Sequence, residues 1–190
     1  NREDSDRPTT RKLASTPHRF GEIRYKATES IIFPSISSER RDYIPIGYLD
    51  ADTVISNKAF AVYDAHPWTF ALLTSRMHMA WVTVVSGRFN DDYQYSNTIV
   101  YNTFPVPRLT DAQRERLTHV AFRVLDVREY HSEKTLAKLY DPDLMPDDLR
   151  LSHQELDELV DSIYRKRGFD SDEDRLSYLF GMYEQMISAE

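Results

Sequence analysis

The 190-residue sequence contains no cysteine, which excludes disulfide bonds and thiolate metal sites. Only five residues are glycine, so there is little material for a glycine loop that cradles phosphate or for the sharp turn that presents a serine nucleophile. No apolar run approaches the roughly 20 residues that a membrane-spanning helix requires, and the polar first twelve residues do not resemble a signal peptide. These absences predict a cytoplasmic protein without a membrane partner.

Metal-binding patterns are missing as well. The six histidines are scattered without the paired spacing of a zinc or iron site. His153-Gln154-Glu155 has no second histidine one turn later, which favours a helix start at the surface over a metal ligand. The acids of Asp141-Pro142-Asp143 and Asp147-Asp148 suit a solvated loop that caps the next helix better than a cation site. We therefore predict neither a catalytic residue nor a metal ligand in this chain.

The net charge of −7 is unevenly distributed. Residues 1–108 hold 13 Lys and Arg against 12 Asp and Glu, whereas residues 109–190 hold 11 against 19. The near-neutral first part can approach phosphates, and the acidic second part should avoid them. With 41% hydrophobic residues the chain is long enough for one good domain or two small ones. The charge asymmetry favours two, with a boundary near residue 108.

The first part is predicted to combine short strands with one long helix. Stretches rich in β-branched and aromatic residues predict strands at 20–25, 30–33, 42–46, 53–56, 59–63 and 93–96. The strands at 53–56 and 59–63 flank Asn57-Lys58 and are expected to form a hairpin. Apolar residues spaced three and four apart predict a single helix from Pro67 to Val85. A short helix is expected to end near Ala14, before Pro17.

The second part is predicted to be helical. Thr110-Asp111-Ala112-Gln113 has the pattern of a capping box, and Ser152 and Ser171 are expected to open two further helices. A short helical turn is expected at 135–140. These patterns predict the α+β class: a mixed, mostly antiparallel sheet with a long helix in residues 1–108, followed by a small all-α helical domain in residues 109–190.

The most informative polar run is Arg88 to Ser96, which follows the apolar helix. Arg pairs with guanine, Asn and Gln pair with adenine, and Asp accepts a hydrogen bond from cytosine in the major groove, so this run covers much of the base-reading code. A plain hairpin turn at Asn90-Asp91-Asp92 explains the same composition. The loop 35–41, with its hydroxyls and two guanidinium groups, suits phosphate oxygens or a solvated turn equally well.

Asn102-Thr103-Phe104-Pro105 is similar to the Asn-Pro-Pro-aromatic turn with which amino-methyltransferases hold their target base. Thr103 and Phe104 replace its two prolines, and no glycine-rich cofactor loop precedes it. We interpret this string as the exit from a strand, and not as a catalytic motif.

Several long motifs resemble the C-terminal part of the MmeI-like family, the large prokaryotic adenine methyltransferases that are often fused to a nuclease. The strings are YIPIGYL, VISNKAFAVYDA, LLTSRMHMAWVTVVSGR, YQYSNTIVYNTFP, KTLAKLYDPDLMP and HQELDELVDSIYRK. The resemblance covers nearly the whole chain from about Arg11. It implies that this chain corresponds to the target recognition domain and the C-terminal helical domain, and that it is a fragment of a longer protein.

The resemblance also implies a partner, a cofactor and a site. Residues up to about Pro107 would bind double-stranded DNA, next to a methyltransferase domain of the same parent chain that uses S-adenosylmethionine, with no cofactor in this chain. By position, base reading falls to Asn90 and Asp92, with Asp91 and Gln94 as further candidates. Contacts to the DNA backbone, or support of the readers, fall to Arg88, Ser96, Arg40, Arg41, Ser37 and Ser38. His78 and Trp81 are expected to pack in the platform.

The same sequence leaves a second class of function open. The acidic helical part could dock a protein partner, in which case the chain would be an interaction or scaffolding module and the run at Arg88 only a turn.

Overall fold

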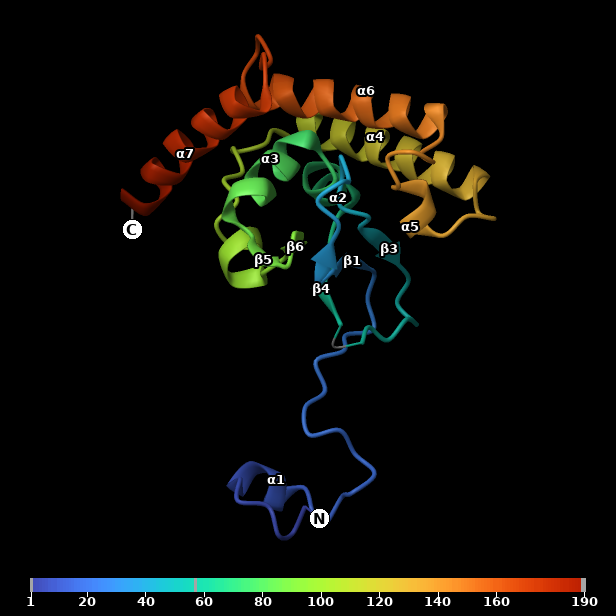
Figure 1. Cartoon of the computed structure of the whole chain (residues 1–190), viewed down its shortest axis with the longest axis vertical. Helices are drawn as coiled ribbons and strands as arrows, with labels where there is room; N and C mark the ends of the chain where they lie inside the picture. The colour runs from blue at the N-terminus through green and yellow to red at the C-terminus, as the bar shows by residue number, and fades with distance from the viewer. Residues whose placement is uncertain (1, 57, 189–190) are drawn as a thin grey trace.

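The computed structural model describes residues 2–56 and 58–188. Its first part contains two three-stranded antiparallel sheets, with the strand orders β3-β1-β4 and β2-β6-β5. The strands are β1 (Ser30–Pro34), β2 (Ile36–Ser37), β3 (Gly47–Leu49), β4 (Ala59–Tyr63), β5 (Gly87–Phe89) and β6 (Asp92–Gln94). The short helix α1 (Pro8–Lys12), close to the position predicted, lies on an extended N-terminal segment that projects away from the body (Figure 1).

The strands β1 and β2 are separated only by Ser35, yet they belong to different sheets. The Ser35 amide donates to the Lys58 carbonyl (3.4 Å), and the Ser35 carbonyl accepts from the Tyr95 amide (3.0 Å). The first contact faces the β4 side and the second faces β6. One stretch of chain therefore links the sheet of the core to the sheet that carries the predicted polar run.

The strand predictions are confirmed in part. β1 and β4 match the strands predicted at 30–33 and 59–63, and β6 overlaps the one at 93–96. The segments 20–25, 42–46 and 53–56 are not strands, and the expected hairpin is wrong because β4 pairs with β1. Asn57 of its predicted turn lies outside the described residues. Strand preference depends on neighbours to pair with, and within the described part of the chain no strand lies beside the exposed Phe20 and Ile23.

Two helices, α2 (Pro67–Leu73) and α3 (Arg76–Val85), replace the single helix predicted. The Ser75 hydroxyl donates to the Leu72 carbonyl (2.6 Å) and accepts from the His78 amide (3.3 Å). The Asp157 carboxylate accepts from the Arg76 amide (2.7 Å). The first amides of a helix lack partners within it, so these contacts stabilise a new helix start that the apolar spacing could not reveal.

The second part consists of helices, preceded by a π-helical turn. The turn is η1 (Asn97–Tyr101), which still belongs to the first part. The helices of the second part are α4 (Asp111–Tyr130), α5 (Leu136–Leu139), α6 (Asp147–Tyr164) and α7 (Asp172–Ser188). The capping box at Thr110 is confirmed, as are the helix starts near Thr135 and Ser171. The start predicted at Ser152 is wrong: α6 begins at Asp147, so Ser152 and His153 lie in its interior and are buried. The segment Asn102–Pro105 was predicted to follow a strand, but it follows the π-helical turn η1.

The helices of the second part pack on helices of the first part. α4 contacts α2 and α6, and α7 contacts α3. In Figure 1, α4, α6 and α7 arch over α2 and α3. The α+β class with a helical second part is confirmed, and one core of buried side chains extends through both parts. Within the described residues, no helix combines the length and the apolar character that crossing a bilayer requires.

A buried polar cluster connects the two parts through Arg128 of α4. Its Nη1 donates to the Ile46 carbonyl (2.8 Å), and its Nε donates to the Tyr140 hydroxyl oxygen (2.7 Å). The Tyr140 hydroxyl donates in turn to Nε2 of His153 (2.7 Å). Burial, with a smaller contribution from the Arg128 charge, lowers the pKa of His153 well below 6.5, so the ring accepts this bond as the neutral form. The guanidinium also lies over the Phe70 ring, 5.0 Å from its centroid.

A second polar contact joins α3 to α6 and α7. The Arg76 guanidinium donates from Nε and Nη2 to the Asp172 carboxylate (2.9 and 2.6 Å). Asp157, besides its bond to the Arg76 amide, accepts from the Tyr43 hydroxyl (2.6 Å). Burial raises the pKa of Asp157 to about 7, because it outweighs these two hydrogen bonds, which lower the pKa.

Asp157 should make the stability of the fold depend on pH. Its folded-state pKa lies above the unfolded value of about 3.9, so its contribution is fully present below pH 4 and is lost as the pH rises towards 7. We expect the stability advantage of the wild type over Asp157→Asn to shrink by roughly 1–2 kcal/mol between pH 5 and pH 8, after allowance for partial solvent screening. Urea unfolding of both proteins at each pH measures this difference, and the buried histidines cancel in the comparison.

The exposed neighbour on the same helix provides the control. Glu158→Gln removes a carboxylate that lies in solvent, and its stability difference from the wild type should stay constant over the same pH range. An Asp157→Asn difference that is equally flat would contradict the raised pKa.

Candidate functional site

The predicted polar run folds into a hairpin of β5 and β6. The cross-strand pairs are Gly87 with Gln94, Arg88 with Tyr93, and Phe89 with Asp92. The connection consists of Asn90 and Asp91, and Asn90 has a φ of 54°. This left-handed backbone conformation is better tolerated by Asn than by most other residues. The hairpin therefore places Asn90 and Asp91 at an exposed tip.

One face of the hairpin packs against the body of the domain. Tyr93 is buried, and Ser37, opposite it on β2, is 2% exposed. The Arg88 guanidinium lies over the Tyr93 ring, 4.1 Å from its centroid, and donates to the carbonyl of Asp91 (2.8 Å). It also lies 3.7 Å from the Glu39 carboxylate. Arg88 therefore holds the turn to the strand beneath it.

The other face of the hairpin points to solvent. Since side chains alternate along a strand, Phe89, Asp92 and Gln94 share this face, and Ile36 joins it because it pairs with Gln94. Phe89 is 55% exposed and Ile36 is 40% exposed. Gly87 pairs with Gln94 from the other side, and a Cβ at Gly87 would lie 3.6 Å from the Gln94 side-chain oxygen. The absence of that atom leaves the carboxamide of Gln94 uncovered.

The segment behind the hairpin is anchored by buried side chains. Tyr95, directly after β6, is buried, and its ring stacks on Phe33 with 4.9 Å between centroids. Its hydroxyl donates to Nε2 of His78 (3.2 Å), whose Nδ1 donates to the Leu73 carbonyl (2.7 Å). Burial lowers the pKa of His78 to about 4, so this ring is neutral at physiological pH. His78 and Trp81 are each 1% exposed, which confirms that they pack in the platform.

The predicted supporting residues occupy different environments. Ser96 caps η1: its hydroxyl accepts from the Ile99 amide (3.2 Å). The Ser37 hydroxyl is buried without a hydrogen-bond partner among the described residues, so in this conformation it lies beneath the surface. Ser38 is half-buried and accepts from the Arg40 amide (3.4 Å). Arg40 itself is exposed and donates to Asp143 (2.6 Å).

Arg41 is half-buried beside this loop, and its Nε has no hydrogen-bond partner among the described residues. Solvent-exposed ion pairs such as Arg40–Asp143 are weak, so Arg40 can exchange its carboxylate for another anion. Both guanidinium groups lie close in sequence to β2, which pairs with β6. The structure thus brings the loop 38–41 and the hairpin together through one sheet.

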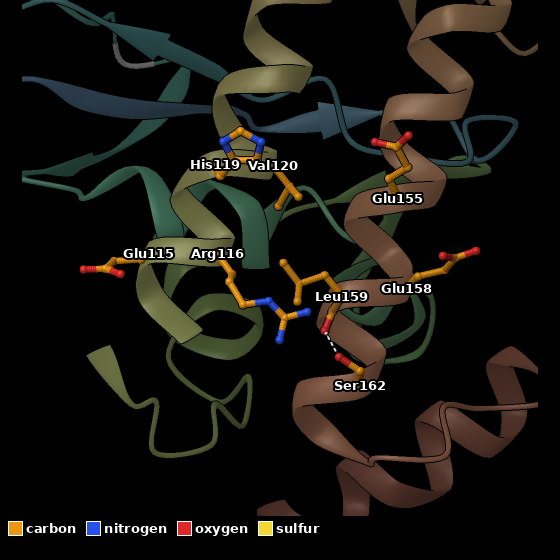
Figure 2. Close-up of a pocket in the computed structure, with 8 residues that line it drawn as sticks. All are labelled: Glu115, Arg116, His119, Val120, Glu155, Glu158, Leu159 and Ser162. Carbon is orange, nitrogen blue, oxygen red and sulfur yellow. Dashed lines mark hydrogen bonds between the residues drawn. The ribbon is translucent and has the colours of Figure 1, made fainter. Parts of the chain in front are cut away.

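Outside the hairpin, an open groove of about 620 Å³ lies between α4 and α6. Figure 2 shows its lining: Glu115, Arg116, His119, Val120, Glu155, Glu158, Leu159 and Ser162. None of these residues belongs to the hairpin or its sheet. No group of three or more potential metal ligands occurs among residues 2–56 and 58–188.

Two exposed apolar side chains of the hairpin sheet, Ile36 and Phe89, were missed as candidates from the sequence. The signal was present for Phe89, because it directly precedes the tip and alternates with Arg88. The pairing of Ile36 with Gln94 joins residues that are far apart in the sequence, and no local pattern predicts it.

An α+β domain with an exposed polar hairpin, packed on a set of helices, has the organisation of a recognition module. The chain belongs to the MmeI family: residues 1–108 match the MmeI target recognition domain, and residues 109–189 match the MmeI C-terminal domain.

Two known proteins are similar to this chain. DNA methyltransferase A of Bacillus subtilis (strain 168) is 43% identical over 185 residues, which cover 97% of this chain and 21% of the relative. A solved structure of the Type IIL restriction-modification enzyme MmeI in complex with DNA superposes with a TM-score of 0.90 at 39% identity, over 98% of this chain and 25% of that one. The chain therefore spans about a quarter or less of the length of these relatives.

Proposed function

We propose that this chain is a sequence-recognition module for double-stranded DNA and that the solvent-facing side of the β5–β6 hairpin reads base edges in the major groove. The observation that carries the proposal is the division of the hairpin into two faces. Arg88 and Tyr93 anchor one face, while Asp92 and Gln94 on the other are free to contact a partner. The match to a DNA-bound MmeI structure supports DNA as that partner.

The residue types fit the edges of particular bases. A carboxamide such as that of Asn90 or Gln94 can pair with N6 and N7 of adenine, and the Asp92 carboxylate can accept from the amino group of cytosine. Asp91, at the exposed tip, can accept from a second amino group. Each carboxylate repels phosphate, so the backbone charge must be met by cations outside the hairpin. Arg40 and Arg41, on the loop that enters the same sheet, are suited to this contact.

The chemistry of the parent protein would lie outside this chain. The chain covers about a fifth of a DNA methyltransferase and a quarter of a restriction-modification enzyme. We infer a cytoplasmic, adenine-specific methyltransferase that uses S-adenosylmethionine, in which this module fixes the register on DNA and the helical part braces it against the methyltransferase domain. A nuclease activity would also belong to the remainder of such a protein.

Substitutions at the hairpin should change the sequence that is methylated. Asn90→Gly keeps the backbone conformation that the φ of 54° requires but removes the carboxamide, and Asp92→Asn replaces an acceptor by a group that also donates. Each is expected to relax or alter one position of the recognised sequence, with a loss of about 1–3 kcal/mol for the original base. Methylome sequencing of a host that expresses each full-length variant measures the outcome.

Arg40→Ala and Arg41→Ala are the matched controls. Because phosphate contacts carry no sequence information, these variants should weaken binding to all duplexes alike and reduce the dependence of binding on salt. An unchanged methylation site in both hairpin variants would contradict the assignment of the readers. Indifference of the full-length protein to duplex DNA at low salt would instead favour a module that docks a protein partner.

A further inference from the structure

Phe89 is an apolar side chain that lies exposed on the solvent-facing side of the hairpin. It pairs directly with Asp92 on the solvent-facing side of the hairpin, and 55% of its surface is exposed. Directly opposed residues on one face of an antiparallel pair have Cβ atoms about 4.5–5.5 Å apart. The apolar ring and the proposed cytosine-reading carboxylate therefore project side by side from the same surface.

Neighbouring base pairs in a duplex are stacked about 3.4 Å apart, so two side chains at this spacing can reach adjacent base pairs. The major-groove edge of a pyrimidine offers an apolar contact at C5, which is the methyl group in thymine, and Phe is among the side chains that contact it. Apolar wedges that unstack bases belong to proteins that bind the minor groove, whereas Phe89 is flanked by Asp92 and Asn90, whose hydrogen-bonding groups suit the major groove.

We propose that Phe89 is a further specificity-determining residue, whose ring contacts the C5 edge of a pyrimidine in the base pair next to the one that Asp92 reads. This inference rests on the proposed function of the hairpin. The contact would detect the C5 methyl group itself, and so distinguish thymine from uracil and 5-methylcytosine from cytosine. The hydrogen-bonding residues of the hairpin cannot make this distinction, because the two bases of each pair present the same donors and acceptors. A methyl group removed from water corresponds to roughly a fourfold change in affinity.

The test uses the full-length protein and synthetic duplexes that contain its methylation site, as determined by methylome sequencing. Each thymine is replaced singly by deoxyuridine, which removes only the methyl group, and each cytosine is replaced singly by 5-methylcytosine. For the wild type, we expect one pyrimidine position at which the C5 methyl changes the dissociation constant by about fourfold. In Phe89→Ala this methyl effect should disappear at that position, which should neighbour the one altered by Asp92→Asn.

Phe122→Ala is the matched control, because Phe122 is also a half-exposed phenylalanine but lies on α4. It should retain the methyl effect at every position. If no pyrimidine shows a methyl effect that differs between the wild type and Phe89→Ala, the proposal is wrong, even where binding remains sequence-specific. If the wild type does not distinguish its site from unrelated duplexes, the proposed function fails instead. Thermal unfolding of each variant confirms that the fold is retained.

Discussion

Replacement of Arg128 by alanine is expected to lower the free energy of unfolding by about 2–5 kcal/mol, because two buried oxygens lose a donor and the contact with the Phe70 ring is lost. Arg128 is 7% exposed and satisfies the Ile46 carbonyl and the Tyr140 hydroxyl oxygen at once. Without the guanidinium, both buried oxygens lose a donor, and each unmet group costs about 1–3 kcal/mol. Urea unfolding followed by circular dichroism measures the loss.

Arg123, on the same helix, provides the comparison. Its guanidinium pairs with Glu155 and its side chain is half-exposed, so Arg123→Ala should change stability by no more than about 1 kcal/mol. Equal losses in the two variants would mean that the effect comes from helix α4 in general. The buried cluster would then contribute little to the contact between the two parts.

Replacement of Trp81 by alanine should have an effect of similar size, about 3–5 kcal/mol. Trp81 is 1% exposed, and its ring lies 5.2 Å from that of Phe180 and 5.7 Å from that of Tyr183, measured between centroids. The substitution therefore removes an aromatic side chain against which α7 packs. We expect α7 to become accessible to protease before the rest of the chain, which limited proteolysis with mass spectrometry would detect.

Val84, one turn further along α3, is 53% exposed. Val84→Ala should alter stability by no more than about 0.5 kcal/mol and should leave the cleavage pattern unchanged. Cleavage of α7 at the same rate in the wild type and in Trp81→Ala would contradict the role of Trp81 as its anchor.

Local chemistry made part of this fold predictable from the sequence. The capping box at Thr110 and the hydroxyl at Ser171 mark helix starts through contacts within four residues. The break between α2 and α3 was not predictable, because one of its stabilising contacts comes from Asp157, about 80 residues later in the chain. The start of α6 was misplaced since Ser152 resembles a cap, although its hydroxyl donates to the Leu149 carbonyl inside the helix.

The candidate site shows the same limit. From the sequence, a hairpin turn at Asn90-Asp91-Asp92 was one of two explanations of the polar run, and the structure has a hairpin whose connection is Asn90-Asp91. The residue types did not reveal that Arg88 would be tied to the Asp91 carbonyl and the Tyr93 ring, or that Ile36 would join the solvent-facing side. Those arrangements depend on the pairing of β2 with β6, and the chain passes from the sheet of β1 to the sheet of β2 at Ser35.

The alternation of faces along β6 has a consequence for how the chain can diverge. Asp92 and Gln94 stand on ordinary extended backbone, so exchange of either for another polar residue changes the chemistry of the outer surface with little penalty to folding. Asn90 stands at a φ of 54°, where most other side chains add a backbone penalty of roughly 1–2 kcal/mol. Related sequences should therefore contain many different residue types at positions 92 and 94, and few at position 90.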